Sequence, residues 1–92
     1  MRDEIVHQPD ASRWVLLRDG GIASVLDYAD DGRTVSMTRT FTNHPFRRQG
    51  LADRVVAAAV ADAAAQGRRV RPMCWFVAQW FDEHPDQAHL LA

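Results

Sequence analysis

A short segment in the middle of the chain combines the residue types that bind phosphate. Arg47 and Arg48 stand just before Gly50, and a stretch of helical periodicity begins at Leu51, followed by the small residue Ala52. The first backbone N–H groups of a helix have no internal partners and lie at the positive end of the helix dipole. Glycine lets the backbone approach an anion closely, and the arginines add charge. The segment therefore predicts a phosphate site, although an ordinary loop that enters a helix has the same pattern.

Cys74 is the second candidate for chemistry, as the only cysteine of the chain. A thiol becomes a nucleophile when positive charge or a helix start lowers its pKa, and both arginines and an expected helix adjoin Cys74. A buried, inert cysteine at a strand end explains the residue equally well. One cysteine cannot form an internal disulfide, which favours a reducing compartment, and the four histidines show no zinc-ligand spacing, so no metal is expected.

In the first half of the chain, apolar and polar residues alternate, which predicts the strands that must support these residues. We expect strands over 5–7, 13–18, 22–28 and 34–42, with turns at 19–21 and 30–32. In the last of these strands, Phe41 is expected to share a face with Val35, Met37 and Arg39, opposite a row of threonines. The four strands together predict an antiparallel meander.

Helices are expected in the second half. Apolar residues recur three and four positions apart from Leu51 to Ala63, which predicts an amphipathic helix that Gly67 ends. A strand over 69–74 follows, and Pro72 places it at a sheet edge or interrupts it. A short helix then runs to about Glu83, and the segment 87–92 can form a further helical turn. This order predicts an α+β fold in which helices cover a mostly antiparallel sheet.

Length and composition describe one folded unit. The chain has 92 residues and a mass of 10.4 kDa, with 47% hydrophobic and 25% charged residues, so we expect a single domain over 1–92 rather than a disordered or multi-domain chain. The N-terminus is charged and leads into no apolar stretch of signal or membrane length. A cytoplasmic protein without a membrane partner is expected.

Charge is distributed unevenly along the chain. All eleven basic residues are arginines, and the segment 39–71 holds seven of them against two aspartates, a local charge of +5 in a chain of net charge −1. A basic middle segment indicates an anionic partner, although solvated arginines on a helix and its loops would give the same count. Nucleic acid is an unlikely partner, because the segment has no lysine and its only aromatic residues are Phe41 and Phe46.

The pattern Arg47-x-x-Gly50-x-Ala52 after a strand resembles the coenzyme A pyrophosphate loop, Q/R-x-x-G-x-G/A, of the Gcn5-related N-acetyltransferases. The run from Pro72 to Val77 with Cys74 at its third position, then Trp80 and His84-Pro85-Asp86, is similar to the P-x-C-S-Y-V, Y and H-P-E elements of the smallest members of that superfamily. The resemblance covers about 4–86. It implies a minimal form of the family's fold, with acetyl-CoA as cosubstrate.

The resemblance also implies where the cosubstrate binds. The pantetheine arm would lie in a gap between 38–42 and 69–74, with Cys74 beside the thioester as the catalytic residue. In the family's more usual route, the acceptor amine attacks the thioester directly. The residues implied to contact coenzyme A are Phe41, Thr42, Arg47, Arg48, Gln49, Gly50, Leu51 and Ala52.

Departures from the family pattern leave three functions open. The family's two tyrosines are Phe76 and Trp80 here, and neither can donate a proton. The first hypothesis is an acetyl-CoA-dependent N-acetyltransferase of minimal size that acts on an amine of a small molecule, peptide or protein. The second is a coenzyme A binding module without catalysis, and the third is an arginine-rich domain for an anionic partner. The oligomeric state is not determined by these patterns.

Overall fold

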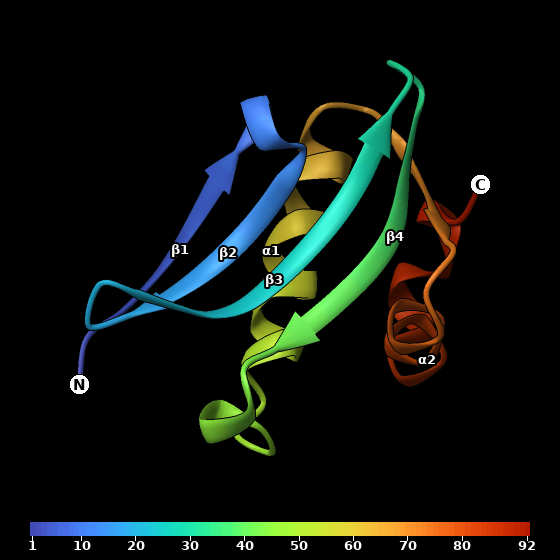
Figure 1. Ribbon diagram of the computed structural model, residues 1–92. Coiled ribbons are helices and arrows are strands. Elements are labelled where there is room, and N and C mark those ends of the chain that lie inside the picture. Colours follow the sequence, from blue (N-terminus) through green and yellow to red (C-terminus); the bar gives the residue numbers. More distant parts are fainter.

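Five strands form one sheet in which order in space follows order in the chain (Figure 1). The computed structural model describes residues 1–92. The first four strands pair with one another in antiparallel fashion, and the fifth is parallel to the fourth. The α+β class with a mostly antiparallel sheet is therefore confirmed. The strands are β1 (Asp3–Gln8), β2 (Arg13–Arg18), β3 (Gly21–Asp30), β4 (Thr34–Thr42) and β5 (Arg69–Pro72).

Two α-helices follow the meander, α1 (Leu51–Ala65) and α2 (Trp75–Glu83). Gly67 follows α1 with φ +71°, and the N–H of Arg68 returns to the carbonyl of Ala63, so the expected glycine end of the helix is confirmed. Short 3-10 turns η1, η2 and η3 span Pro9–Ala11, His44–Phe46 and Pro85–Leu90. None of the helices combines the length and apolarity that crossing a bilayer requires.

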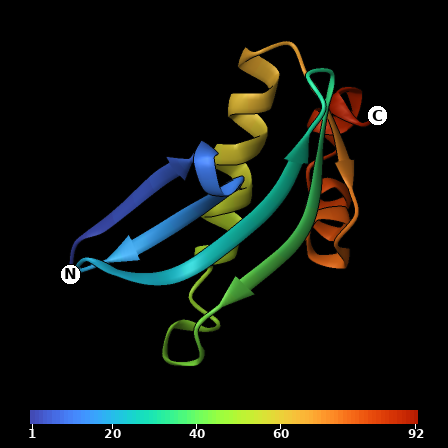
Figure 2. The ribbon, with the colours of Figure 1, turned by 45° about the horizontal axis from the view of Figure 1, so that its top comes forward.

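The core lies between α1 and one face of the sheet (Figures 1 and 2). The apolar stripe of α1 is buried as its periodicity predicts, and α2 adds Val77, Trp80 and Phe81 to the same cluster. The sheet contributes buried side chains from four strands: Leu16, Ala23, Leu26, Val35, Met37 and Val70. The opposite face of the sheet carries no helix (Figure 1). The short turn η1 is all that connects β1 to β2.

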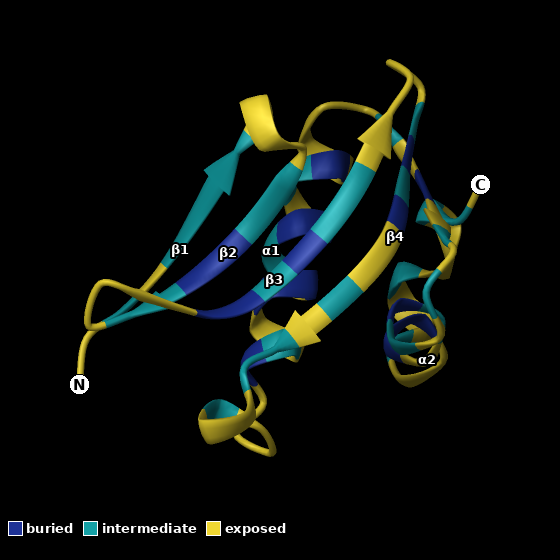
Figure 3. Cartoon of the chain, in the orientation of Figure 1, coloured by how far each residue is buried: buried dark blue, intermediate teal, exposed yellow.

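A bulge at Thr38 reverses the two faces of β4. Met37 pairs with Tyr28 and Arg39 pairs with Asp27, so Thr38 has no partner residue on β3. Residues beyond the bulge therefore point the other way, and Phe41 lies on the open face, 39% exposed and under the Arg39 guanidinium. The prediction that Phe41 shares a face with Met37 is wrong, because a strict period of two cannot anticipate an extra residue. Figure 3 shows β4 changing from buried to exposed along its length.

All four residues of β5 pair with β4, but only with its first four residues. The ladder runs from Thr34 opposite Arg69 to Met37 opposite Pro72. The Met37 carbonyl then accepts two hydrogen bonds, from the N–H groups of Met73 at 3.0 Å and Cys74 at 3.2 Å. Beyond this point the chain turns into α2, while β4 continues to Thr42 with β3 as its only strand partner. Of the expected second wall, 69–74, residues 69–72 pair with 34–37 instead, whereas Cys74 and the start of α2 lie beside the gap along 38–42.

Candidate functional site

A cavity of about 310 Å³ opens where the loop after β4 enters α1; we call it the loop cavity. It is lined by six of the eight residues that the resemblance implied would contact coenzyme A. Three further residues line it that the sequence did not single out for this role, Phe46, Asp53 and Phe76. The six predicted residues are Thr42, Arg47, Arg48, Gly50, Leu51 and Ala52.

The start of α1 offers the loop cavity a set of free backbone donors. Gly50 stands before the helix with φ +73°, and no side chain caps this end. The N–H groups of Gly50, Leu51, Ala52 and Asp53 donate no hydrogen bond within the chain. A Cβ added to Gly50 would meet no atom within 4 Å, so the space in front of it is open. This combination of unpartnered donors and helix dipole is suited to a phosphate group.

Only two of the seven arginines in the basic segment belong to the loop cavity. The Arg47 Nε donates to the Thr42 carbonyl at 3.1 Å, and Arg48 makes no hydrogen bond within the chain. Four others bind acidic side chains or backbone carbonyls elsewhere: Arg39 binds Asp27, Arg54 binds Asp3, Arg68 binds Asp30, and Arg69 binds the carbonyls of His89 and Leu91. The seventh, Arg71, is exposed on β5. The local charge of +5 in the segment 39–71 is therefore not concentrated at the loop cavity.

Asp53 places a carboxylate among the lining residues of the loop cavity. An acidic side chain in the first turn is favourable for the helix itself, because it faces the positive end of the dipole. The same charge opposes a bound phosphate. Backbone donors and two arginines must therefore outweigh one carboxylate for an anion to bind.

Phe41 and Gln49 do not line the loop cavity. The Phe41 side chain points to the open face of the sheet, as described above, so only its backbone lies along the gap beside β4. The Gln49 side-chain oxygen accepts a hydrogen bond from Arg18 Nη1 at 2.6 Å. Gln49 therefore serves to fix the loop rather than to present its side chain to a ligand.

Arg18 connects the loop to the first strand through what we call the Asp3 clasp: Asp3, Arg18, Gln49 and Arg54. Arg18 binds both oxygens of Asp3, at 2.8 and 2.9 Å, and Arg54 binds Asp3 from α1 at 2.8 Å. The Arg18 guanidinium also lies 5.7 Å from the centre of the Phe46 ring in the loop. Hydrogen bonds from Arg18 and Arg54 hold the pKa of the Asp3 carboxyl well below its usual range.

Cys74 lies at the inner end of the gap beside β4, immediately before α2. Its Sγ is 3.5 Å from the Thr40 hydroxyl, which the bulge turns toward this side. Burial raises the pKa of the Cys74 thiol, but hydrogen bonds from Thr40 and from the N–H groups of Phe76 and Val77 favour the thiolate. The resulting pKa lies below its ordinary value, as a thiol at a helix start requires for reactivity.

No histidine or tyrosine side chain makes a hydrogen bond to Thr40 or Cys74. The Nδ1 of His84 is 2.6 Å from the Trp80 carbonyl, and its ring stacks on the Trp80 ring, so His84 ends α2. His44 is exposed on η2, and His7 binds Tyr28 at the far side of the molecule. No group of three or more His, Cys, Asp or Glu side chains is arranged to hold a metal ion. The donors available at the gap are therefore the backbone, Thr40 and the Cys74 thiol.

The Asp3 clasp should make stability depend on pH. Because the pKa of Asp3 is lowered on folding, the clasp stabilises fully above the unfolded value of about 3.9 and is lost as pH falls below it. Thermal unfolding followed by circular dichroism should show Asp3→Asn with a lower Tm than the parent at pH 6, and the difference should shrink below about pH 4. Asp10→Asn, at an exposed aspartate on η1, is the control and should change Tm little. A difference for Asp3→Asn that stays constant with pH would contradict the role of the clasp.

The Thr40 contact should be measurable as a shift in thiol reactivity. Cys74 is the only thiol, so the pH dependence of its alkylation by iodoacetamide reports its pKa directly. We expect an apparent pKa below that of the same thiol in urea, and a higher value in Thr40→Val, which removes the hydroxyl donor. Thr38→Val is the matched control, because Thr38 is exposed and bonds the Asp27 carbonyl instead. An unchanged value in Thr40→Val would show that the contact does not stabilise the thiolate.

Comparison with known proteins places the chain in a family. A family model described as GCN5-related N-acetyl-transferase matches residues 13–90. The solved structure of Ard1 from Thermoplasma volcanium is similar in fold, with a TM-score of 0.59 at 18% identity over 65% of this chain and 42% of that chain. The chain thus spans less than half the length of this neighbour. No curated protein matches the sequence. Since the family match extends over most of the chain, and the fold agrees with it, the chain belongs to the GCN5-related N-acetyltransferase family.

Proposed function

We propose that the protein is an acetyl-CoA-dependent N-acetyltransferase that transfers an acetyl group to an amine. The observation that carries this proposal is the continuity of two features through Thr42. Thr42 is the last residue of the unpaired edge of β4, and it also lines the loop cavity. One extended ligand could therefore place a phosphate end at α1 and its other end beside Cys74.

The loop cavity supplies the donors for the pyrophosphate of coenzyme A. Its oxygens would accept hydrogen bonds from the free N–H groups at Gly50, Leu51 and Ala52, with the guanidinium groups of Arg47 and Arg48 alongside. The pantetheine arm carries amide groups, and it would pair with the backbone of 38–42 as an added strand. The peptide groups of Phe41 and Thr42 would take part through this edge.

Direct transfer is the first route compatible with this geometry. The amine nitrogen attacks the thioester carbonyl, the new C–N bond forms as the C–S bond breaks, and coenzyme A leaves as a thiolate. The proton of the amine would pass through water to the leaving thiolate, since no histidine or tyrosine is hydrogen-bonded to Thr40 or Cys74. Met73 and Trp75 beside Cys74 are 61% and 74% exposed, so the acceptor side is accessible.

Transfer through Cys74 is the second route. The Cys74 thiolate attacks the thioester carbonyl, which releases coenzyme A and leaves an acetyl group on Sγ. The amine then attacks this second thioester, the C–N bond forms as the C–Sγ bond breaks, the amine proton passes to water, and the Cys74 thiolate returns. The contacts with Thr40 and the start of α2, which lower the pKa of Cys74, support this route.

A coenzyme A binding module without catalysis is the second candidate function. Phe76 and Trp80 stand where the family has tyrosines; Phe76 lines the loop cavity, and Trp80 is buried in the core. Neither side chain provides a hydroxyl, so binding could persist without a proton donor. The third hypothesis, a basic surface for an anionic macromolecule, is less favoured, because Arg39, Arg54 and Arg68 each pair with an aspartate. A reducing compartment such as the cytoplasm would keep Cys74 in its thiol form.

Two glycines provide a matched test of coenzyme A binding. Gly50 and Gly67 have nearly the same φ, +73° and +71°, and a Cβ at either meets no neighbour. Glu at each position should therefore lose a similar amount of stability, about 1 to 2 kcal/mol for the left-handed conformation. Calorimetric titration should show Gly50→Glu with a Kd for coenzyme A raised by about tenfold or more, because the carboxylate fills the loop cavity, and Gly67→Glu with a Kd close to that of the parent. Equal affinities in the two variants, or no binding by the parent, would contradict the assigned site.

Turnover separates the enzyme from the binding module. Thiol release from acetyl-CoA, measured across a panel of amines with the parent and with Cys74→Ala, should exceed background in the parent. Loss of turnover in Cys74→Ala, together with acetyl-Cys74 detected by mass spectrometry, is the result expected of the second route. Full turnover in Cys74→Ala would leave direct transfer. Background rates for every amine, with coenzyme A binding intact, would show that the protein only binds the cosubstrate.

A further inference from the structure

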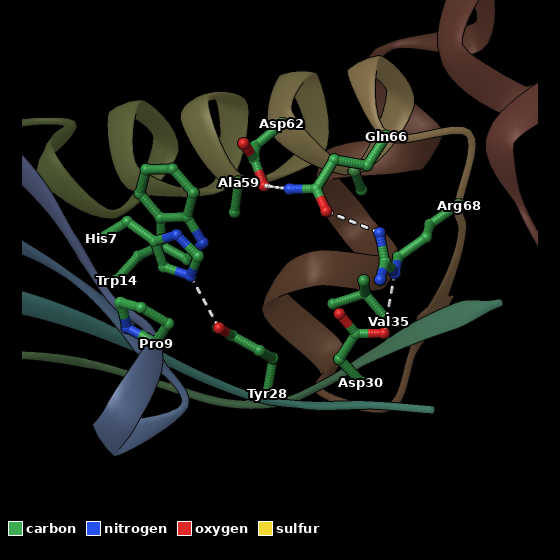
Figure 4. Close-up of a pocket in the computed structure, with 11 residues that line it drawn as sticks. His7, Pro9, Trp14, Tyr28, Asp30, Val35, Ala59, Asp62, Gln66 and Arg68 are labelled. Atoms are coloured by element: carbon green, nitrogen blue, oxygen red, sulfur yellow. Dashed lines mark hydrogen bonds and ion pairs between the residues drawn. The ribbon is translucent and has the colours of Figure 1, made fainter. Parts of the chain in front are cut away.

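A second cavity, of about 190 Å³, lies between the second half of α1 and the strands β1 to β4 (Figure 4). It shares no lining residue with the loop cavity. Its floor is apolar, because Val35, Ala59 and Ala63 are buried there in the core. The volume is below the roughly 300 to 1,000 Å³ of pockets that take drug-sized ligands, so it suits a small group.

Aromatic side chains form one wall of this cavity. His7 and Trp14 face each other across β1 and β2, and their rings stack with centroids 4.3 Å apart and planes within 6°. The His7 Nε2 is 2.6 Å from the Tyr28 hydroxyl, so the three rings are fixed relative to one another. Figure 4 shows them on one side of the cavity, with Gln66 and Arg68 on the other. A rigid aromatic face attracts cations through its quadrupole.

Two carboxylates in the wall retain unused acceptor oxygens. Asp30 binds Arg68 Nε at 2.9 Å and the Gly32 N–H at 2.8 Å, both through Oδ1, which leaves Oδ2 without a hydrogen bond. Asp62 accepts only the neutral amide of Gln66 through Oδ2, at 2.6 Å, so its Oδ1 is free and its charge has no cationic partner. Burial raises the pKa of Tyr28, and the negative charges of Asp30 and Asp62 raise it further, so both carboxylates act electrostatically on the Tyr28 hydroxyl.

We propose that this second cavity binds a small alkylammonium ion. The ammonium group would donate to Asp62 Oδ1, with the Asp30 carboxylate elsewhere in the same wall, and its short aliphatic stem would lie on Ala59 and Ala63 against the Trp14 ring. Arg68 balances the charge of Asp30, so the unpaired charge of the wall is that of Asp62. It repels an anion, and a neutral ligand leaves it without a partner. The site shares no residue with the loop cavity, so alkylammonium binding would not require coenzyme A.

Titration with n-butylammonium chloride, followed by ¹H–¹⁵N NMR of the Trp14 indole, tests the site; Trp14→Phe assigns the signal. We expect saturable shifts at millimolar concentration, and an apparent Kd about tenfold weaker in Asp62→Asn. Asp82→Asn is the matched control, because Asp82 is an exposed aspartate on α2, and it should keep the parent Kd. Sodium chloride at equal ionic strength and the neutral analogue n-butanol should give no saturable shift.

Three results would overturn the proposal. They are an equal response to n-butanol, an unchanged Kd in Asp62→Asn, and the absence of saturation in the parent protein. The circular dichroism spectrum and Tm of Asp62→Asn should match those of the parent, since Asn keeps the side-chain shape and an oxygen for Gln66. If Asp62→Asn is instead less stable than the parent, Asp30→Asn measured in the same way decides: a weakened Kd supports the site, and an unchanged Kd overturns it.

Discussion

The early end of the β4–β5 ladder is the constraint on which the site depends. Since the Met37 carbonyl binds both Met73 and Cys74, the backbone must leave the sheet at that point and enter α2. This single branching of hydrogen bonds has two effects. It exposes one edge of β4 from Thr38 onward, and it places the only thiol at the start of a helix beside that edge. The bulge at Thr38 then turns the Thr40 hydroxyl toward the thiol, so the two irregularities act together.

In the proposed coenzyme A site, backbone dipoles rather than net charge would provide the affinity for the phosphate groups. Most arginines of the basic segment are held by carboxylates or carbonyls elsewhere. At the loop cavity, the negative charge of Asp53 offsets part of the positive charge of Arg47 and Arg48. The unpartnered N–H groups at Gly50 and beyond have no such competition, because no side chain caps the helix. A site of this kind would lose less affinity in salt than one built from exposed arginines, since its donors are fixed backbone dipoles rather than full charges.

Local patterns in the sequence determine the elements, and contacts between distant residues determine the details of the site. The limits of β2 and β4 and the glycine end of α1 followed from alternation and helical periodicity, and six of the eight predicted loop residues line one cavity. The reversal at Thr38 was not predictable, because a bulge changes the period without changing residue type. The Asp3 clasp was equally unpredictable, since Asp3 and Arg54 lie 51 positions apart and only the packing of α1 on the sheet brings them together.

The position of β1 at the sheet edge has a consequence for both cavities. Its two ends are fixed by side chains rather than by a second neighbouring strand: Asp3 by Arg18 and Arg54, and His7 by Trp14 and Tyr28. A slip of β1 by one residue would turn both side chains to the other face of the sheet. The same slip would then loosen the loop at α1 and open the aromatic wall at the opposite end. The alignment of one edge strand therefore sets the shape of two sites that share no residue.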